Sequence, residues 1–102
     1  MRTENLGDTL LVTDLPTLTS DTSRAFKEYV RGALAPAHTI VEVDLATARS
    51  VDSSGLGALI SIHKTLCLRG GRVKLLNPPP LIAEMFRILE FNKLFEIIQR
   101  PT

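Results

Sequence analysis

The sequence predicts an α/β domain built on a largely parallel or mixed β-sheet with crossover helices. Segments of strand character alternate along the chain with segments whose apolar residues follow the period of a helix. Short polar, glycine or proline links separate these segments. Strands that alternate with helices are usually joined by helical crossovers, so the order strand, helix, strand, helix, strand, helix, strand is typical of this class. The length of 102 residues is that of one domain, and we expect a single domain over residues 1–102.

The first half of the chain is expected to contribute two strands and a helix. The apolar run at residues 10–12 predicts a strand that ends at Pro16. Residues 19–21 offer side chains that cap helices, and a helix is predicted to follow them. Residues 39–45 are rich in β-branched side chains and predict a central strand. The apolar stripe of the first helix is formed by Phe26, Tyr29, Val30, Ala33 and Leu34.

The second half is expected to contribute two helices and two strands. A helix over residues 56–68 is predicted to end at Gly70–Gly71, where glycine can adopt a left-handed conformation. A strand follows at residues 72–76, and a last strand is predicted at 94–98. The apolar side of the helix at 56–68 carries Leu56, Leu59, Ile60, His63, Leu66 and Cys67. The prolines at 78–80 begin a third helix, with a stripe of Leu81, Ile82, Met85, Phe86 and Leu89.

Composition narrows the function classes. The formal net charge is +1 and no basic run occurs, so we expect no nucleic-acid partner. No apolar run approaches the roughly 18 residues of a membrane span, so we expect no direct membrane insertion. The single cysteine, Cys67, and a start that lacks signal-peptide character favour a cytoplasmic protein.

The most unusual chemistry lies at Val51–Gly57, between a predicted strand and a predicted helix. An acidic residue, two hydroxyls and two glycines meet there. Such a junction exposes backbone N–H groups and the positive end of a helix dipole, which suits an anion. The segment is therefore a candidate phosphate receptor, nucleophile, phosphorylation target or helix cap.

Catalysis, nucleotide binding by a Walker loop and metal binding each lack required residues. A hydrolase elbow needs glycine two residues before the serine, but Val51 and Asp52 occupy those positions. No lysine follows the glycines as a Walker loop requires, and one cysteine with two distant histidines lacks metal-ligand spacing. We therefore expect that the protein is not an enzyme and that it binds neither a cofactor nor a metal ion. A cap formed by Ser53 or Ser54 remains an alternative, although it accounts for only one hydroxyl.

Three segments together resemble the STAS domain family, most closely its anti-sigma factor antagonists from bacterial partner-switching systems. They are Ser50–Leu59 with its Asp-Ser-Ser-Gly-Leu-Gly motif, Arg69–Pro78 with its Gly-Gly pair, and Ile88–Ile97. The resemblance covers roughly residues 39–98. Residues 13–18 depart from the family, whose Gly-x-Leu/Ile-Asp motif has no glycine counterpart here. The expected fold is accordingly a single STAS-like domain.

The resemblance implies a phosphorylation switch at Ser53. In such proteins the matching serine is phosphorylated by a kinase that is also the anti-sigma factor, and a phosphatase resets it. The unphosphorylated antagonist binds that kinase. The expected contact surface is Asp52, Ser53, Ser54, Gly55, Leu56 and Gly57. Two alternatives are a STAS subunit that docks to a lipid-transport or transporter assembly, and a nucleotide or small-molecule sensor at the same turn.

Overall fold

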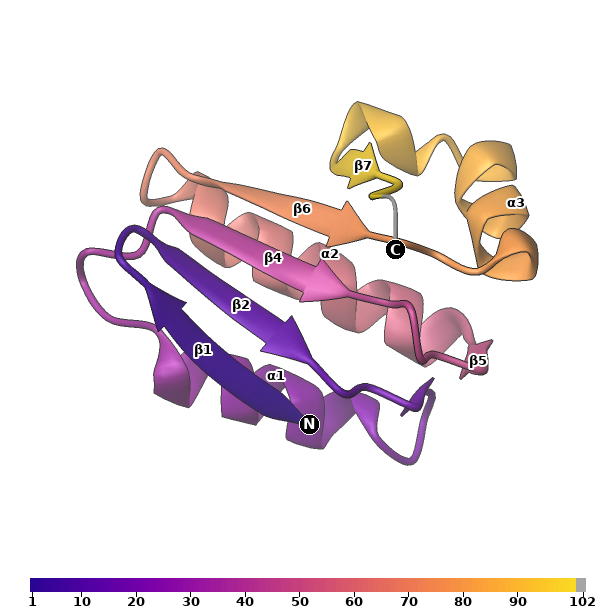
Figure 1. The fold of residues 1–102 in the computed structure, drawn as a ribbon, viewed down its shortest axis with the longest axis horizontal. Helices are drawn as coiled ribbons and strands as arrows, with labels where there is room; N and C mark the ends of the chain where they lie inside the picture. Colours follow the sequence, from indigo (N-terminus) through magenta and orange to yellow (C-terminus); the bar gives the residue numbers. More distant parts are fainter. Residues whose placement is uncertain (101–102) are drawn as a thin grey trace.

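The computed structural model describes residues 1–100, and these form a mixed five-stranded sheet with helices. Its strand order is β1-β2-β4-β6-β7 (Figure 1). Only β1 is antiparallel to its neighbour. The strands of this sheet are β1 Arg2–Leu6, β2 Thr9–Thr13, β4 Ile40–Asp44, β6 Arg72–Leu76 and β7 Glu96–Ile98. The helices are α1 Ser23–Ala33, α2 Ser53–Cys67, α3 Pro80–Ile88 and the short 3-10 helix η1 Phe91–Lys93. The predicted fold class and mixed sheet are confirmed.

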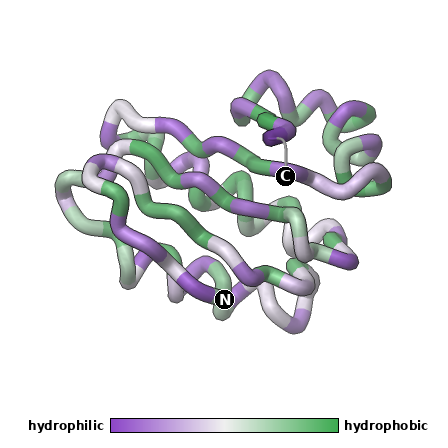
Figure 2. The backbone as a smooth tube through the Cα atoms, viewed as in Figure 1, coloured by the Kyte–Doolittle hydropathy of each residue, from purple (hydrophilic) through white to green (hydrophobic). Residues whose placement is uncertain are grey.

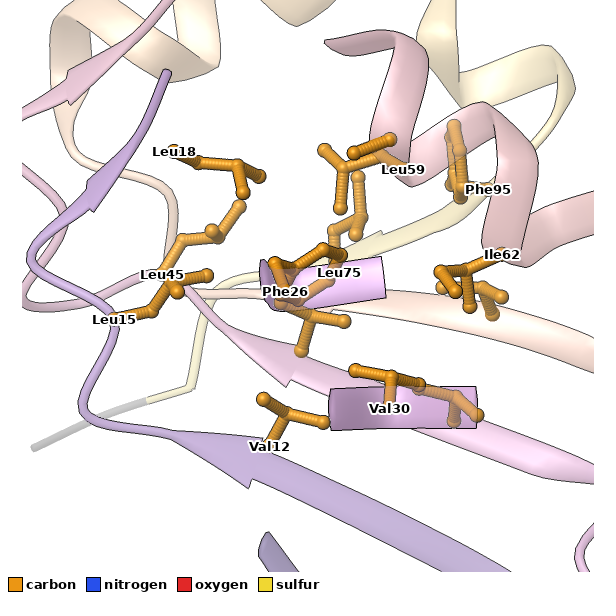
Figure 3. Packing of buried hydrophobic residues seen from close by; sticks show 14 of the residues in the cluster. Val12, Leu15, Leu18, Phe26, Val30, Leu45, Leu59, Ile62, Leu75 and Phe95 are labelled. Carbon is orange, nitrogen blue, oxygen red and sulfur yellow. The ribbon is translucent and has the colours of Figure 1, made fainter. Parts of the chain in front are cut away.

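Helices α1 and α2 lie side by side against one face of the sheet (Figure 1). The main core lies between these two helices and the sheet. Phe26 and Val30 of α1 and Leu59 of α2 are fully buried there, together with strand residues such as Val12 and Leu75 (Figure 3). The tube of β2 is mostly hydrophobic, whereas that of the edge strand β1 is mostly hydrophilic (Figure 2). Burial of these apolar side chains is the main force that holds the layers together.

Strand β4 is the central strand, as its sequence predicted, and it buries a carboxylate. Glu42 lies on the sheet face opposite the core residues Val41 and Val43, and it is only 8% exposed. Its Oε2 accepts a hydrogen bond from Arg100 Nη2 at 3.1 Å. Because a buried carboxylate is stable only with a partner, the chain after β7 compensates this charge.

Strand β1 was not predicted, because its sequence contains a single apolar residue. It forms by antiparallel pairing with β2 through the Gly7–Asp8 turn, with Leu6 opposite Thr9. As an edge strand with exposed side chains, it needs no hydrophobic face of its own.

Two short strands were also not predicted from the sequence. Thr17–Leu18 (β3) pairs in parallel with Ser50–Val51 (β5), where a capping segment and a polar link were expected. The cap position of α1 is Thr22, so the prediction of a cap at residues 19–21 was wrong. Tertiary pairing overrides local sequence preference for elements of only two residues.

The predicted apolar stripes were only partly right. In α1, Phe26 and Val30 are buried but Tyr29 is 45% exposed. In α2 the buried face is Gly55, Ala58, Leu59, Ile62 and Leu66, so Cys67 is exposed instead of packed. In α3 only Ile82 and Phe86 are buried. Leu81 is 86% exposed and Leu89 50%, because α3 packs at the end of the sheet and leaves its other side uncovered.

The last strand is shorter than predicted, because only Glu96–Ile98 pair with β6. The backbone N–H groups of Leu94 and Phe95 donate instead to the carbonyl oxygen of Phe91 in η1. Phe86 stacks on Phe91 at a centroid distance of 5.2 Å, and Phe91 contacts Phe95 at 5.3 Å. This aromatic cluster joins α3 and η1 to the core. The predicted left-handed glycine after α2 is confirmed at Gly70, whose φ is +71°.

Candidate functional site

The Asp52–Gly57 segment lies at the carboxyl end of the parallel strands, where α/β sheets usually place their sites (Figure 1). The link after β4 leads into β5, and α2 begins at Ser53. Strand β5 pairs with β3, which brings the segment after β3 to the start of α2. The site is therefore built from two parts of the chain about thirty residues apart.

Asp52 caps α2 and joins it to the loop after β3. Its Oδ1 accepts the Gly55 N–H at 3.0 Å, and its Oδ2 accepts the Ser20 N–H at 2.9 Å. The Asp52 N–H donates to the Leu18 carbonyl oxygen at 3.2 Å. The structure thus assigns the cap to Asp52 and not to Ser53 or Ser54, the alternative that the sequence had left open. Aspartate takes this role because its carboxylate reaches two backbone donors at once.

These hydrogen bonds lower the pKa of Asp52 below its usual value, first through the Gly55 amide and then through the Ser20 amide. Both donors stabilise the charged carboxylate, as does the positive end of the helix dipole. Asp52 is therefore ionised at neutral pH and contributes a fixed negative charge beside the serines.

Gly55 provides the contact between α2 and β3. A Cβ at this position would lie 1.9 Å from the Leu18 carbonyl oxygen and 2.7 Å from the Leu18 carbonyl carbon. No side chain fits there. A Cβ at Gly57 would meet nothing within 4 Å, so the two glycines of the motif have different structural roles.

The two serines occupy the exposed first turn of α2. Both side chains are exposed, and among residues 1–100 neither hydroxyl has a hydrogen-bond partner. Gly57 is exposed on the next turn, whereas Leu56 is half-buried against the core. Six residues were expected to form the contact surface. Of these, Ser53, Ser54 and Gly57 are exposed, Asp52 and Leu56 are half-buried, and Gly55 is buried.

Sequence reasoning missed Leu18 and Ser20 as parts of this site. Their contribution comes from backbone groups, the Leu18 carbonyl and the Ser20 N–H, which carry no residue-specific signal. The hydroxyl-rich run that contains Ser20 indicated a helix cap instead.

The histidines lie away from the serines. His63 is ten residues along α2 from Ser53, roughly 15 Å along the helix axis, and it packs on Phe95 with a centroid distance of 5.3 Å. His38 is buried before β4, at the opposite end of the sheet, where it contacts Asn5. Over the part of the chain that the structure describes, no group of three or more metal-ligating side chains occurs. Within those same residues, no helix has the length and apolar character to cross a bilayer.

Solved structures with the same fold include three of low sequence identity to this chain. A putative anti-sigma factor antagonist from Thermotoga maritima is 18% identical, with a TM-score of 0.88 over 97% of this chain and 86% of that one. The anti-sigma factor antagonist SpoIIAA in its unphosphorylated form is 19% identical, with a TM-score of 0.82 over 98% of this chain and 87% of that one. Phosphorylated SpoIIAA from Bacillus, also 19% identical, gives 0.74 over 98% and 90%.

The murine anion transporter Slc26a9 contains a similar domain. It is 15% identical, with a TM-score of 0.77 over 96% of this chain and 17% of the transporter. No curated protein sequence gives a significant match. The family model described as "Mlab, STAS domain" matches residues 16–99. That match spans most of the sequence, including the Asp52 cap and both serines, and the chain belongs to the STAS domain family.

Proposed function

We propose that this protein is a non-enzymatic anti-sigma factor antagonist controlled by phosphorylation of Ser53. In its unphosphorylated form it binds a cognate anti-sigma factor that is also a serine kinase. Phosphorylation of Ser53 releases that partner, and a phosphatase restores binding. On this proposal the protein works in the cytoplasm and needs no cofactor.

The observation that carries the proposal is the exposed, unpartnered Ser53 hydroxyl beside the Asp52 cap. The hydroxyl has no role in the fold that phosphorylation would remove, since Asp52 makes the capping hydrogen bonds. A kinase can therefore modify it without first opening the domain. The likeness to SpoIIAA, solved in unphosphorylated and phosphorylated forms, supports the same reading.

Electrostatics explains how one phosphate would weaken partner binding while the domain stays folded. It adds a charge of about −1.5 to −2 at the first position of α2, where the helix dipole offsets part of the cost. The same charge stands next to the ionised Asp52 carboxylate. An interface that covers this turn would have to desolvate both charges together, so binding is lost while the core is untouched.

Phosphopeptide mapping of the protein isolated from its native cells tests the assignment. We expect phosphate on Ser53 in the wild type and none on the Ser53→Ala variant. Ser54→Ala is the matched control, since Ser54 is the neighbouring serine on the same turn and is also exposed. Phosphate that persists in Ser53→Ala and disappears in Ser54→Ala would reject the assignment.

A second candidate is a STAS subunit that docks to a transporter or lipid-transport assembly. The likeness to a domain of the Slc26a9 anion transporter favours it. In that case the serine turn is a permanent docking surface. Affinity purification from native membranes and cytosol separates the two roles: membrane transport subunits without a kinase would favour docking, and a kinase without those subunits would favour the switch.

A further inference from the structure

A cavity of about 490 Å³ opens at the carboxyl end of the sheet, apart from the serines themselves. One wall is the link between β4 and β5, residues 46–49, and the other is the entry to α3, residues 79–82. The two walls follow the parallel strands β4 and β6, so they lie at the same end of the sheet (Figure 1). The volume falls within the range of about 300–1,000 Å³ that is common for small-molecule sites.

The lining of this cavity is mostly apolar. The link contributes two alanines, and the entry to α3 contributes Pro79, Pro80, Leu81 and Ile82. Leu81 is 86% exposed, which is high for a large apolar side chain at the rim of a pocket. An apolar ligand group in the cavity would remove this surface from water.

The charge at the cavity is positive and comes from one arginine side chain. Arg49 is the one charged residue of the lining, and among residues 1–100 its side chain forms no ion pair or hydrogen bond. Its backbone is fixed, because its N–H donates to the Pro16 carbonyl oxygen at 2.8 Å. The acidic residues that flank Arg49 in the sequence both accept backbone hydrogen bonds: Asp44 from the Ala46 N–H at 2.9 Å, and Asp52 from the N–H groups of Gly55 and Ser20. The adjacent start of α3 adds positive potential through its helix dipole, and no side chain of the described residues caps this end.

We propose that this cavity binds a small amphiphilic anion, a monocarboxylate with an aliphatic tail. The carboxylate pairs with the free guanidinium of Arg49, and the tail packs between Ala48 and Leu81. An uncharged amphiphile lacks the first interaction and a short carboxylate lacks the second. This inference does not depend on phosphorylation of Ser53.

Titration of the isotope-labelled protein with decanoate, followed by amide resonances in NMR, tests the proposal. We expect saturable shifts at residues 46–49 and at Leu81 and Ile82, below the micelle-forming concentration. Acetate should cause no such shifts, and decanol should bind more weakly. Absence of saturable shifts at these residues, or equal binding of decanol, would overturn the proposal.

Variants separate the two interactions. Arg49→Gln should weaken decanoate binding roughly fivefold, the size of one exposed charge-assisted pair, and leave decanol unaffected. Leu81→Ser should weaken both ligands. Arg72→Gln is the control, because Arg72 is an exposed arginine at the opposite end of β6, where it lies 3.9 Å from the exposed carboxylate of Glu96. Retained resonance dispersion verifies that each variant is folded. An Arg49→Gln protein that binds decanoate as tightly as the control contradicts the assigned role.

Discussion

The Cα of Gly55 lies against the backbone carbonyl of Leu18, so close that a Cβ would stand 1.9 Å from the carbonyl oxygen. This contact joins the first turn of α2 to β3 and leaves no room for a side chain. It also positions the Asp52 cap, whose own N–H donates to the same Leu18 carbonyl at 3.2 Å. The serine turn is therefore held by the backbone of a segment distant in sequence.

The two motif glycines should respond differently to alanine. Gly55→Ala should lower the free energy of unfolding by about 2–4 kcal/mol, because the backbone of β3 or α2 must move. Gly57→Ala is the matched control and should raise it by up to about 1 kcal/mol, since alanine favours the helix and meets no neighbour. Urea denaturation measures both. Equal effects of the two substitutions would contradict the assigned contact.

Asp52 should make stability depend on pH in the acid range. Its pKa is lower in the folded protein than in the unfolded chain, so its contribution is fully present above the unfolded value, near pH 4, and is lost as the pH falls through the lower folded value. Asp52→Asn should therefore be less stable than the wild type at pH 7, with a smaller difference at pH 3. Asp21→Asn, an exposed carboxylate without a hydrogen-bond partner among the described residues, is the control. A difference independent of pH would show that the charge has no role.

His38 should stabilise the attachment of β1. The buried ring accepts the Ala35 N–H at Nδ1, 2.8 Å away, and its Nε2 lies 3.0 Å from Asn5 Oδ1. His38→Ala should cost about 2–3 kcal/mol through two lost hydrogen bonds and a cavity. Asn5→Ala removes only one of those bonds and should cost less, which thermal unfolding can resolve. A larger loss for Asn5→Ala would show that the ring has another role.

The sequence predicted the elements that have strong periodicity or β-branched runs. The central strand around Val41 and Val43 and the three helices were found because burial imposes a pattern on their residues. The sequence could not predict β1, β3 and β5, which depend on pairing with distant strands. It also overestimated the burial of α3, because Leu81 and Leu89 match a helical stripe whether or not a neighbour covers them.

At the Asp52–Gly57 segment, the sequence indicated an unusual strand-to-helix junction but left open which side chain caps α2. Asp and Ser are both good capping residues, so the motif alone does not decide which of the three side chains accepts the N–H groups of the first turn. The backbone of Leu18 and Ser20 decides it, since it supplies donors and an acceptor at the position of Asp52.

A charge at Ser53 should weaken partner binding without unfolding the domain. Ser53→Asp places one carboxylate at the exposed first position of α2, beside Asp52, and the partner must desolvate both. We expect its melting temperature to stay within about 2 °C of the wild type, as is usual for exposed substitutions. Calorimetry with the captured partner measures the affinity. Thr39→Asp is the control for charge alone, because Thr39 is an exposed hydroxyl residue just before β4, at the opposite end of the sheet.

The most direct test of the switch compares the affinity of the purified kinase partner for unphosphorylated protein and for protein that carries phosphoserine at position 53. We predict that the phosphate weakens binding by roughly 30-fold or more, the scale of a desolvated interface charge, while the melting temperature is retained. Equal affinity for the two forms would contradict the proposed switch.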